Sequence, residues 1–160
     1  MRIMLPSKFQ FDWVLIDELA VGPAPRKQYH IELLISAGIK GILSLCSEDE
    51  VPQPEIPANK IQHRRIILPD HSYGREPTVN EINSTLRELK QLKSIGPVFV
   101  HCKAGIERSP LICIAWLAME KNLSIQSALD YLMQVHPGTN PLANHLMIIE
   151  ELLAKKLTNK

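Results

Sequence analysis

The sequence of 160 residues has few cysteines, almost no net charge and no long hydrophobic run. Its three cysteines are too few and too scattered for a framework of disulfide bonds, so we expect a reduced, cytoplasmic environment. The formal net charge of +1 gives no reason to expect nucleic acid or an anionic membrane as a partner. No apolar run reaches transmembrane length, and residues 1–6 lack the apolar core and cleavage site of a signal peptide. Any recognition of an anion must therefore be local.

The length and composition are those of one globular domain. Apolar residues make up 45% of the chain and charged residues 22%, which suits a soluble protein with a substantial core. The sequence contains no internal repeat, low-complexity segment or linker that would divide it. We therefore expect a single domain over residues 1–160, present as a monomer.

Segments with strand patterns and helix patterns alternate along the chain. The predicted strands are residues 11–16, 19–22, 39–45, 61–68 and 98–100. The predicted helices are residues 26–37, 78–96, 109–119, 125–135 and 142–157. This alternation predicts an α/β fold with a central, mostly parallel sheet flanked by helices, and a ligand site at the carboxyl ends of the strands.

The stretch from Val98 to Pro110 is typical of a short buried strand, a tight loop and the start of a buried helix. Such a junction directs loop N–H groups and the positive end of a helix toward one point, which makes an anion site. Cys102 and Arg108 stand at the two ends of this loop. The residues expected to surround the anion are Lys103, Ala104, Gly105, Ile106 and Glu107, with the glycine relieving the crowding of a tight curl.

Cys102 has the surroundings of a nucleophile. A free thiol has a pKa of about 8.5. Loop amides, a helix N-terminus and Arg108 would all favour the thiolate. Arg108 can also fork onto two phosphate oxygens, which suits in-line attack of sulfur on phosphorus. The departing group needs a proton, and the best candidate donor is Asp70, in a polar loop after a strand expected beside the central one. Ser109 is placed to hydrogen-bond the sulfur.

The run from His101 to Ser109 resembles the HCxxGxxRS signature of cysteine-dependent dual-specificity phosphatases of the small atypical type. The resemblance covers about residues 11–153 and includes Leu68-Pro69-Asp70, which is similar to the general-acid loop of that family. It implies the cysteine-phosphatase fold, with no metal and no other cofactor. It also implies the roles of nucleophile, phosphate clamp, general acid and assisting hydroxyl for Cys102, Arg108, Asp70 and Ser109. Low-molecular-weight tyrosine phosphatases carry a similar loop near the chain start, so position 102 argues against them.

Two positions depart from the family pattern or leave a choice open. Glu107 places a carboxylate beside Arg108, where many relatives carry a neutral or basic residue. We expect it to face away or to pair with another arginine, and to disfavour heavily phosphorylated substrates. Where relatives carry a glutamine or asparagine that positions the hydrolytic water, this chain has Asn144 and His145, and the sequence does not choose between them.

Cys46 ends a strand expected beside the strand that leads to Cys102, an arrangement that would bring the two sulfurs near each other. A similar Leu-Cys-Ser/Ala-Glu stretch occurs in the phosphoinositide 3-phosphatase branch, which forms such a reversible disulfide. A packed thiol is the alternative, and the sequence leaves both open. Of the other polar residues, we expect His101 to be structural. We expect solvated side chains at Glu48, Asp49, Glu50, Arg64, Arg65 and Arg75. For Arg75 the alternative is contact with the substrate.

The predicted function is hydrolysis of phosphate monoesters through a phosphocysteine on Cys102. Phosphorylated tyrosine in proteins, with serine or threonine, is the first-choice substrate, because a short chain has little room for loops that deepen the pocket into a phosphotyrosine-only slot. Alternatives in the same class are phosphoinositides and RNA 5′-phosphates, against which the near-neutral charge and Glu107 argue. The alternative outside the class is a phosphate-binding module without catalysis, against which the intact Cys102, Arg108 and Asp70 argue.

Overall fold

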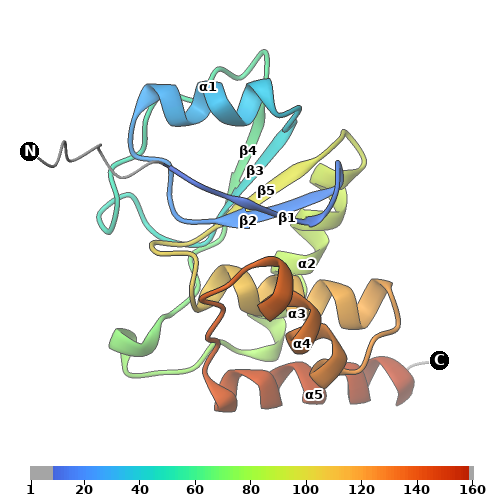
Figure 1. The fold of residues 1–160 in the computed structure, drawn as a ribbon. Coiled ribbons are helices and arrows are strands. Elements are labelled where there is room, and N and C mark those ends of the chain that lie inside the picture. Colours follow the sequence, from blue (N-terminus) through green and yellow to red (C-terminus); the bar gives the residue numbers. More distant parts are fainter. Residues whose placement is uncertain (1–8, 159–160) are drawn as a thin grey trace, which may run out of the picture.

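The computed structural model describes residues 9–158, which form one sheet with helices on both faces (Figure 1). The strands are β1 (Asp12–Leu15), β2 (Leu19–Gly22), β3 (Gly41–Ser44), β4 (Gln62–Arg65) and β5 (Val98–His101). The helices are α1 (Gln28–Ser36), α2 (Val79–Lys93), α3 (Arg108–Glu120), α4 (Ile125–Val135) and α5 (Ala143–Thr158). A short 3₁₀ turn covers His71–Tyr73.

The strands lie in the order β1-β2-β5-β3-β4, and all neighbours are parallel except β1 and β2. This confirms the mostly parallel sheet predicted from the sequence. The predicted strand 61–68 is shorter in the structure, where β4 spans only Gln62–Arg65. The chain beyond it remains bound to β3, since Ile66 N–H donates to the Ser44 carbonyl and Leu68 N–H to the Leu45 carbonyl, at 3.0 Å each.

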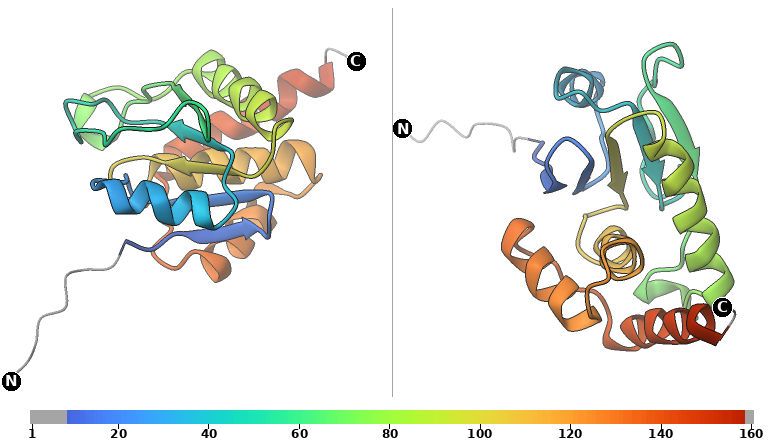
Figure 2. Two further views of the ribbon diagram at one scale, coloured as in Figure 1. Left: turned by 90° about the horizontal axis from the view of Figure 1, so that it is seen from above. Right: turned by 90° about the vertical axis from the view of Figure 1, so that its right-hand side faces the viewer.

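Helix α1 covers one face of the sheet, and α2, α3, α4 and α5 gather on the other (Figures 1 and 2). Side chains alternate along β5, so Phe99 packs in the smaller core beneath α1 while Val98 and Val100 pack in the larger core. Because β5 lies between two strands and two helical layers, all four of its residues are buried. Its carboxyl end is thereby held firmly in the centre of the molecule.

The helix ends follow the signals in the sequence. Thr78 and Glu81 form the predicted capping box of α2, with the threonine hydroxyl accepting from the Glu81 amide at 3.0 Å and the glutamate accepting from the Thr78 amide at 2.9 Å. Ser124 caps α4 in the same way through the Ser127 amide at 3.0 Å. Gly38 follows α1 with a φ of +92°, a conformation that glycine adopts without strain.

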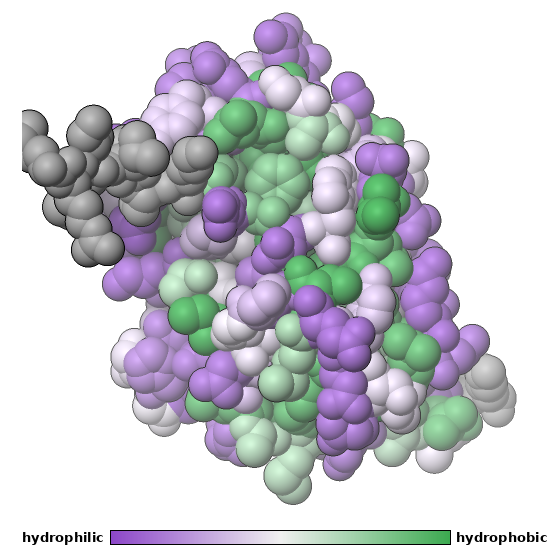
Figure 3. Space-filling view, in the orientation of Figure 1, coloured by the Kyte–Doolittle hydropathy of each residue, from purple (hydrophilic) through white to green (hydrophobic). Residues whose placement is uncertain are grey.

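Helix α3 is buried along almost its whole length, as its apolar sequence predicts, with every residue from Arg108 to Ala118 inside. On the face drawn in Figure 3, hydrophobic residues lie among hydrophilic ones. In the described part of the chain, no helix combines the length and apolarity that crossing a bilayer requires.

Candidate active site

The carboxyl ends of β3, β4 and β5 bring the predicted site residues together. A cavity of about 170 Å³ lies there, and it is lined by Asp70, His71, Cys102, Lys103, Ala104, Ile106, Glu107 and Arg108. Cys102 follows β5 directly, and Arg108 begins α3. The two catalytic candidates and the candidate acid therefore share one cavity, as the sequence predicts.

The loop between Cys102 and Arg108 turns its carbonyl groups outward. The Lys103 carbonyl accepts from the Ala24 amide at 3.1 Å, and the Ile106 carbonyl accepts from the Asn140 amide at 2.9 Å. Because a trans peptide directs its N–H opposite to its C=O, the amides that follow these carbonyls point into the loop. The N–H groups of Ala104 and Glu107 therefore face the inside of the loop, and inward amides of this kind favour an anion.

Gly105 lets this loop approach the end of β2. Its φ is +73°, and a Cβ built there would lie 2.6 Å from the Gly22 carbonyl carbon and 2.8 Å from the Pro23 nitrogen. These are backbone atoms that cannot move aside, so both the conformation and the space require glycine. The sequence predicted a glycine that relieves crowding, and the structure shows the neighbour that causes it.

His136 holds the same loop from outside, a role that the sequence analysis missed. One ring nitrogen, Nε2, lies 2.6 Å from the Gly105 carbonyl oxygen, and Nδ1 lies 2.6 Å from a carboxylate oxygen of Asp12. The histidine therefore links the loop between Cys102 and Arg108 to β1. A His-Pro-Gly run reads as an ordinary turn, and nothing local to it indicates a partner 31 residues earlier.

Cys102 is buried, and its sulfur lies 3.3 Å from the Ser109 hydroxyl oxygen, within hydrogen-bonding distance. Ser109 is itself fully buried in the first turn of α3. This is the contact expected of a hydroxyl that assists the departure of sulfur.

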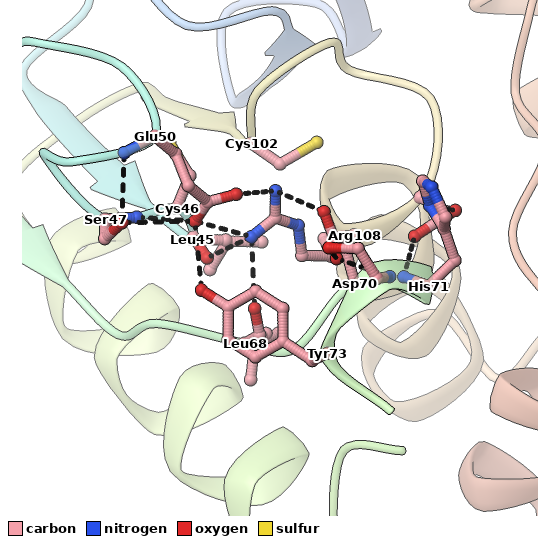
Figure 4. Close-up of polar contacts among 12 residues, drawn as sticks. Leu45, Cys46, Ser47, Glu50, Leu68, Asp70, His71, Tyr73, Cys102 and Arg108 are labelled. Atoms are coloured by element: carbon pink, nitrogen blue, oxygen red, sulfur yellow. Dashed lines mark hydrogen bonds and ion pairs between the residues drawn. The ribbon is translucent and has the colours of Figure 1, made fainter. Parts of the chain in front are cut away.

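Arg108 is held by Glu50 (Figure 4), so the prediction that Glu50 belongs to a solvated acidic run is wrong. The carboxylate accepts from Arg108 Nη2 at 2.8 Å and from Nη1 at 3.2 Å, and Nη1 also donates to the Leu68 carbonyl at 3.1 Å. Within the described residues, the buried Nε–H of Arg108 has no hydrogen-bond partner. The outer edge of the guanidinium is thus anchored by Glu50 and by the Leu68 carbonyl.

Glu50 is well suited to hold this cation. Burial alone would raise the pKa of its carboxyl, but hydrogen bonds from Arg108 and from the Ser47 amide outweigh it and lower the pKa. The Tyr73 hydroxyl also donates to Glu50, at 3.3 Å. Glu50 therefore stays ionised and connects the loop after β3 with the loop that carries Asp70.

Asp70 stands beside Arg108, with 3.7 Å between its Oδ2 and Nη2 of the arginine. Its Oδ1 accepts from the Ser72 amide at 2.8 Å and from the Ser72 hydroxyl. Burial raises the pKa of this carboxyl, but the hydrogen bonds from Ser72 and the charge of Arg108 lower it more. The Asp70 carboxyl therefore lines the cavity wall, and because its pKa is lowered it carries a proton only at low pH.

Glu107 neither faces away nor pairs with an arginine, so that expectation was wrong. Its Oε2 accepts from the His71 amide at 3.1 Å, and its Oε1 lies 2.8 Å from His71 Nδ1. The carboxylate thus joins the loop between Cys102 and Arg108 to the residue directly after Asp70.

His101 lies in a buried chain of hydrogen bonds across three strands, as expected of a structural residue. Its Nδ1 lies 3.0 Å from the Cys102 carbonyl oxygen, so this nitrogen carries the hydrogen. Its Nε2 then accepts from the Ser44 hydroxyl at 2.6 Å, which in turn accepts from His63 Nε2 at 2.8 Å. Desolvation by burial lowers the pKa of both His63 and His101 to about 4, so both rings are neutral.

Cys46 lies next to this chain, with its sulfur 3.9 Å from His101 Nδ1. It is a free, buried thiol, and burial raises its pKa. A disulfide between Cys46 and Cys102 stays a prediction.

Among residues 9–158, no group of three or more His, Cys, Asp or Glu side chains is arranged to hold a metal ion.

Of the three arginines expected to be solvated, Arg64 and Arg75 are exposed, as predicted, whereas Arg65 is half-buried. Arg65 donates to the Cys46 carbonyl and to Gln53, and Arg64 lies 3.6 Å from Glu88. Arg75 is bound to both carboxylate oxygens of Glu81, at 2.7 and 3.0 Å. Each finds its partner outside its own segment, where no sequence pattern indicates it.

Asn144 and His145 line a second cavity of about 250 Å³, which shares Asp70 and His71 with the first. Asn144 donates to Glu76, whereas His145 is buried and its pKa is lowered by desolvation. The choice between them as the residue that positions water remains open.

Residues 21–154 match the family model of the dual specificity phosphatase catalytic domain. The chain is 24% identical over 152 residues to phosphatidylglycerophosphate phosphatase PTPMT2 of Arabidopsis thaliana, covering 94% of this chain and 66% of that protein. It is 46% identical to human dual specificity protein phosphatase 5 over 46 residues, covering 29% of this chain and 12% of that protein. The crystal structure of PTPMT1 in complex with PI(5)P matches with a TM-score of 0.79 and 17% identity, covering 93% and 97% of the two chains. The chain thus spans just under two thirds of the plant relative, and the structural match concerns the fold alone.

Proposed function

The chain belongs to the dual specificity phosphatase family, and from this premise we propose that it hydrolyses phosphate monoesters in two steps through a phosphocysteine on Cys102. The observation that carries the proposal is the single cavity lined by Cys102, Arg108 and Asp70, with the Ser109 hydroxyl 3.3 Å from the sulfur.

In the first step the Cys102 thiolate attacks phosphorus, and the bond from phosphorus to the ester oxygen breaks. Asp70 gives its proton to that oxygen, which leaves as an alcohol. Arg108 and the inward loop amides donate to the equatorial phosphate oxygens and stabilise the negative charge that these oxygens carry in the transition state. In the second step water attacks phosphorus, the bond between phosphorus and sulfur breaks, and the Asp70 carboxylate takes the proton from water. The Ser109 hydroxyl hydrogen-bonds the departing thiolate.

Hydrolysis of an aryl phosphate in the presence of a chelator tests this mechanism. We expect activity in the wild type, no activity in Cys102→Ser, and a phosphorylated Cys102 peptide when the reaction is quenched in acid. An inactive wild type that still binds phosphate would support the non-catalytic module instead. Loss of activity on adding the chelator would contradict the expectation of metal-free chemistry.

For the substrate we propose a lipid headgroup that carries one phosphate monoester. Support comes from the plant phosphatidylglycerophosphate phosphatase, which aligns with nearly the whole chain, whereas the human dual specificity phosphatase aligns with less than a third of it. The charges of the cavity also favour a single phosphate, because Asp70 and Glu107 line it together with Arg108 and Lys103. A second phosphate monoester, with its double negative charge, would be repelled by these carboxylates.

The second candidate remains a phosphorylated protein, favoured by the family itself. A comparison of kcat/KM on phosphatidylglycerophosphate, a phosphatidylinositol monophosphate, a polyphosphoinositide, phosphopeptides and 5′-phosphorylated RNA separates the candidates, with Cys102→Ser as background. We expect the singly phosphorylated lipids to be the best substrates. Faster turnover of phosphotyrosyl peptides would assign the chain to protein substrates. The monomeric state and the cytoplasmic location stay predictions. Size-exclusion chromatography tests the first, and cell fractionation tests the second.

A further inference from the structure

Glu107 occupies a position that neither helix formation nor phosphate binding explains. It is the residue before α3, but its side chain makes no capping hydrogen bond there, and glutamate is not among the residues favoured at a helix N-cap. Its negative charge lies on the wall of the cavity proposed to bind a phosphate dianion, where like charges repel. A carboxylate in this place weakens phosphate binding unless it does something else.

Both oxygens of this carboxylate are committed to His71. The side chain of Glu107 is only 18% exposed, and it accepts from the backbone N–H of His71 while meeting the imidazole through its other oxygen. Since His71 directly follows Asp70, the contact fixes the main chain at the residue next to the proposed acid.

The chain before Asp70 is fixed separately. Arg108 donates to the Leu68 carbonyl at 3.1 Å, two residues ahead of the aspartate. The two neighbours in sequence, Glu107 and Arg108, therefore hold the acid loop at points on either side of Asp70. Without Glu107, these two residues would hold the acid loop only through Arg108, at the Leu68 carbonyl and at the Asp70 side chain, and neither would hold the chain after Asp70.

We propose that Glu107 is a positioning residue, which acts through His71 to keep Asp70 at the cavity that it shares with Cys102. The proposal rests on the proposed function, because it concerns how the acid protonates the leaving group. Its role differs from that of Arg108, since the Glu107 carboxylate is bound to His71 and does not bind the phosphate.

A series of aryl phosphates whose leaving groups differ in pKa tests this role. A poor leaving group depends on protonation by Asp70, whereas a good one departs without it. We expect Glu107→Ala to lower kcat/KM about ten- to a hundredfold on the poorest leaving groups, the scale of a small misplacement, and to leave the best almost unchanged. Glu107→Gln, which keeps the shape and one acceptor, should give a smaller loss with the same trend. His71→Ala retains the backbone N–H and should lose least.

A double mutant separates positioning from a general loss of structure. In an Asp70→Asn background, Glu107→Ala should cause no further loss on poor leaving groups, because the acid that it positions is already gone. The inhibition constant of inorganic phosphate should stay the same or fall, since a negative charge has been removed from the cavity. Glu48→Ala, an exposed carboxylate in the loop after β3, serves as the matched control and should leave the whole series unchanged.

Two results would overturn the proposal: an equal loss on all leaving groups, or a full additional loss in the Asp70→Asn background. Both are measured against an active wild type. An inactive wild type would instead contradict the proposed function.

Discussion

At the scale of single residues, Asp70 and Arg108 lie 3.7 Å apart, and the charge of each shifts the pKa of the other. The hydrogen bonds from Ser72 and the charge of Arg108 outweigh burial and lower the pKa of Asp70. A general acid acts only in its protonated form, and above its pKa that form decreases tenfold with each unit of pH. The proposed acid is therefore most effective on the acidic side of neutrality.

For a poor leaving group we expect kcat/KM to fall as the pH rises from weakly acidic values toward neutrality. In Asp70→Asn the amide cannot donate this proton, so the fall disappears and the rate at acidic pH drops about 10²- to 10⁴-fold. Steady-state kinetics across pH with two aryl phosphates, one good and one poor leaving group, measures both effects. A wild-type profile retained in Asp70→Asn would show that another group is the acid.

The sequence predicts some contacts of these residues and not others, for a physical reason. The contact of Cys102 with Ser109 was expected because a strand, a tight loop and a helix turn fix the positions of residues seven apart. The pairing of Glu50 with Arg108 joins residues 58 apart, through a proline-rich loop whose path no periodicity determines. Glu107 was recognised as unusual, but its partner His71 depends on the same kind of loop path.

At the scale of elements, the helices and strands were predicted well because hydrophobic period and capping residues are local signals. Helix α4 begins and ends at Ile125 and Val135, the residues predicted. The loops are different, since their shape comes from contacts with distant segments. The segment between α4 and α5 illustrates this, because His136 and Asn140 bind the carbonyls of Gly105 and Ile106.

We expect His136→Ala to loosen the phosphate-binding loop, because the Gly105 carbonyl and Asp12 both lose a partner. Hydrogen bonds that involve a charged group contribute about 1.5–3 kcal/mol, so the inhibition constant of inorganic phosphate should rise about tenfold or more. His136→Gln can still donate to the Gly105 carbonyl, so its inhibition constant should rise less. Asp12→Asn keeps an acceptor for the ring, so we expect the smallest rise there. An unchanged inhibition constant in His136→Ala would mean that β2 and α3 hold the loop without this histidine.

At the scale of the whole molecule, one chain of hydrogen bonds crosses the sheet through β4, β3 and β5, by way of His63, Ser44 and His101. The sequence predicts a structural role for His101 but does not reveal this chain, which depends on the order of the strands. Both imidazoles are neutral, since burial lowers the pKa of each to about 4. Protonating either one places a charge inside the sheet.

This arrangement predicts a loss of stability in weak acid. In the unfolded chain a histidine has a pKa of about 6.5, so between pH 6.5 and 4 the unfolded state binds a proton that the folded state does not. Stability therefore falls as the pH falls through this range, and His101 alone lowers the free energy of unfolding by roughly 2 kcal/mol between pH 7 and pH 5. Urea denaturation at pH 7 and pH 5 measures this loss of free energy of unfolding. Both pH values lie above the lowered pKa values of Asp70 and Glu50, so these carboxylates stay ionised and do not contribute. His101→Asn should be less stable at both values yet show a smaller difference between them. A difference equal to that of the wild type would mean that His101 does not resist protonation in the folded protein.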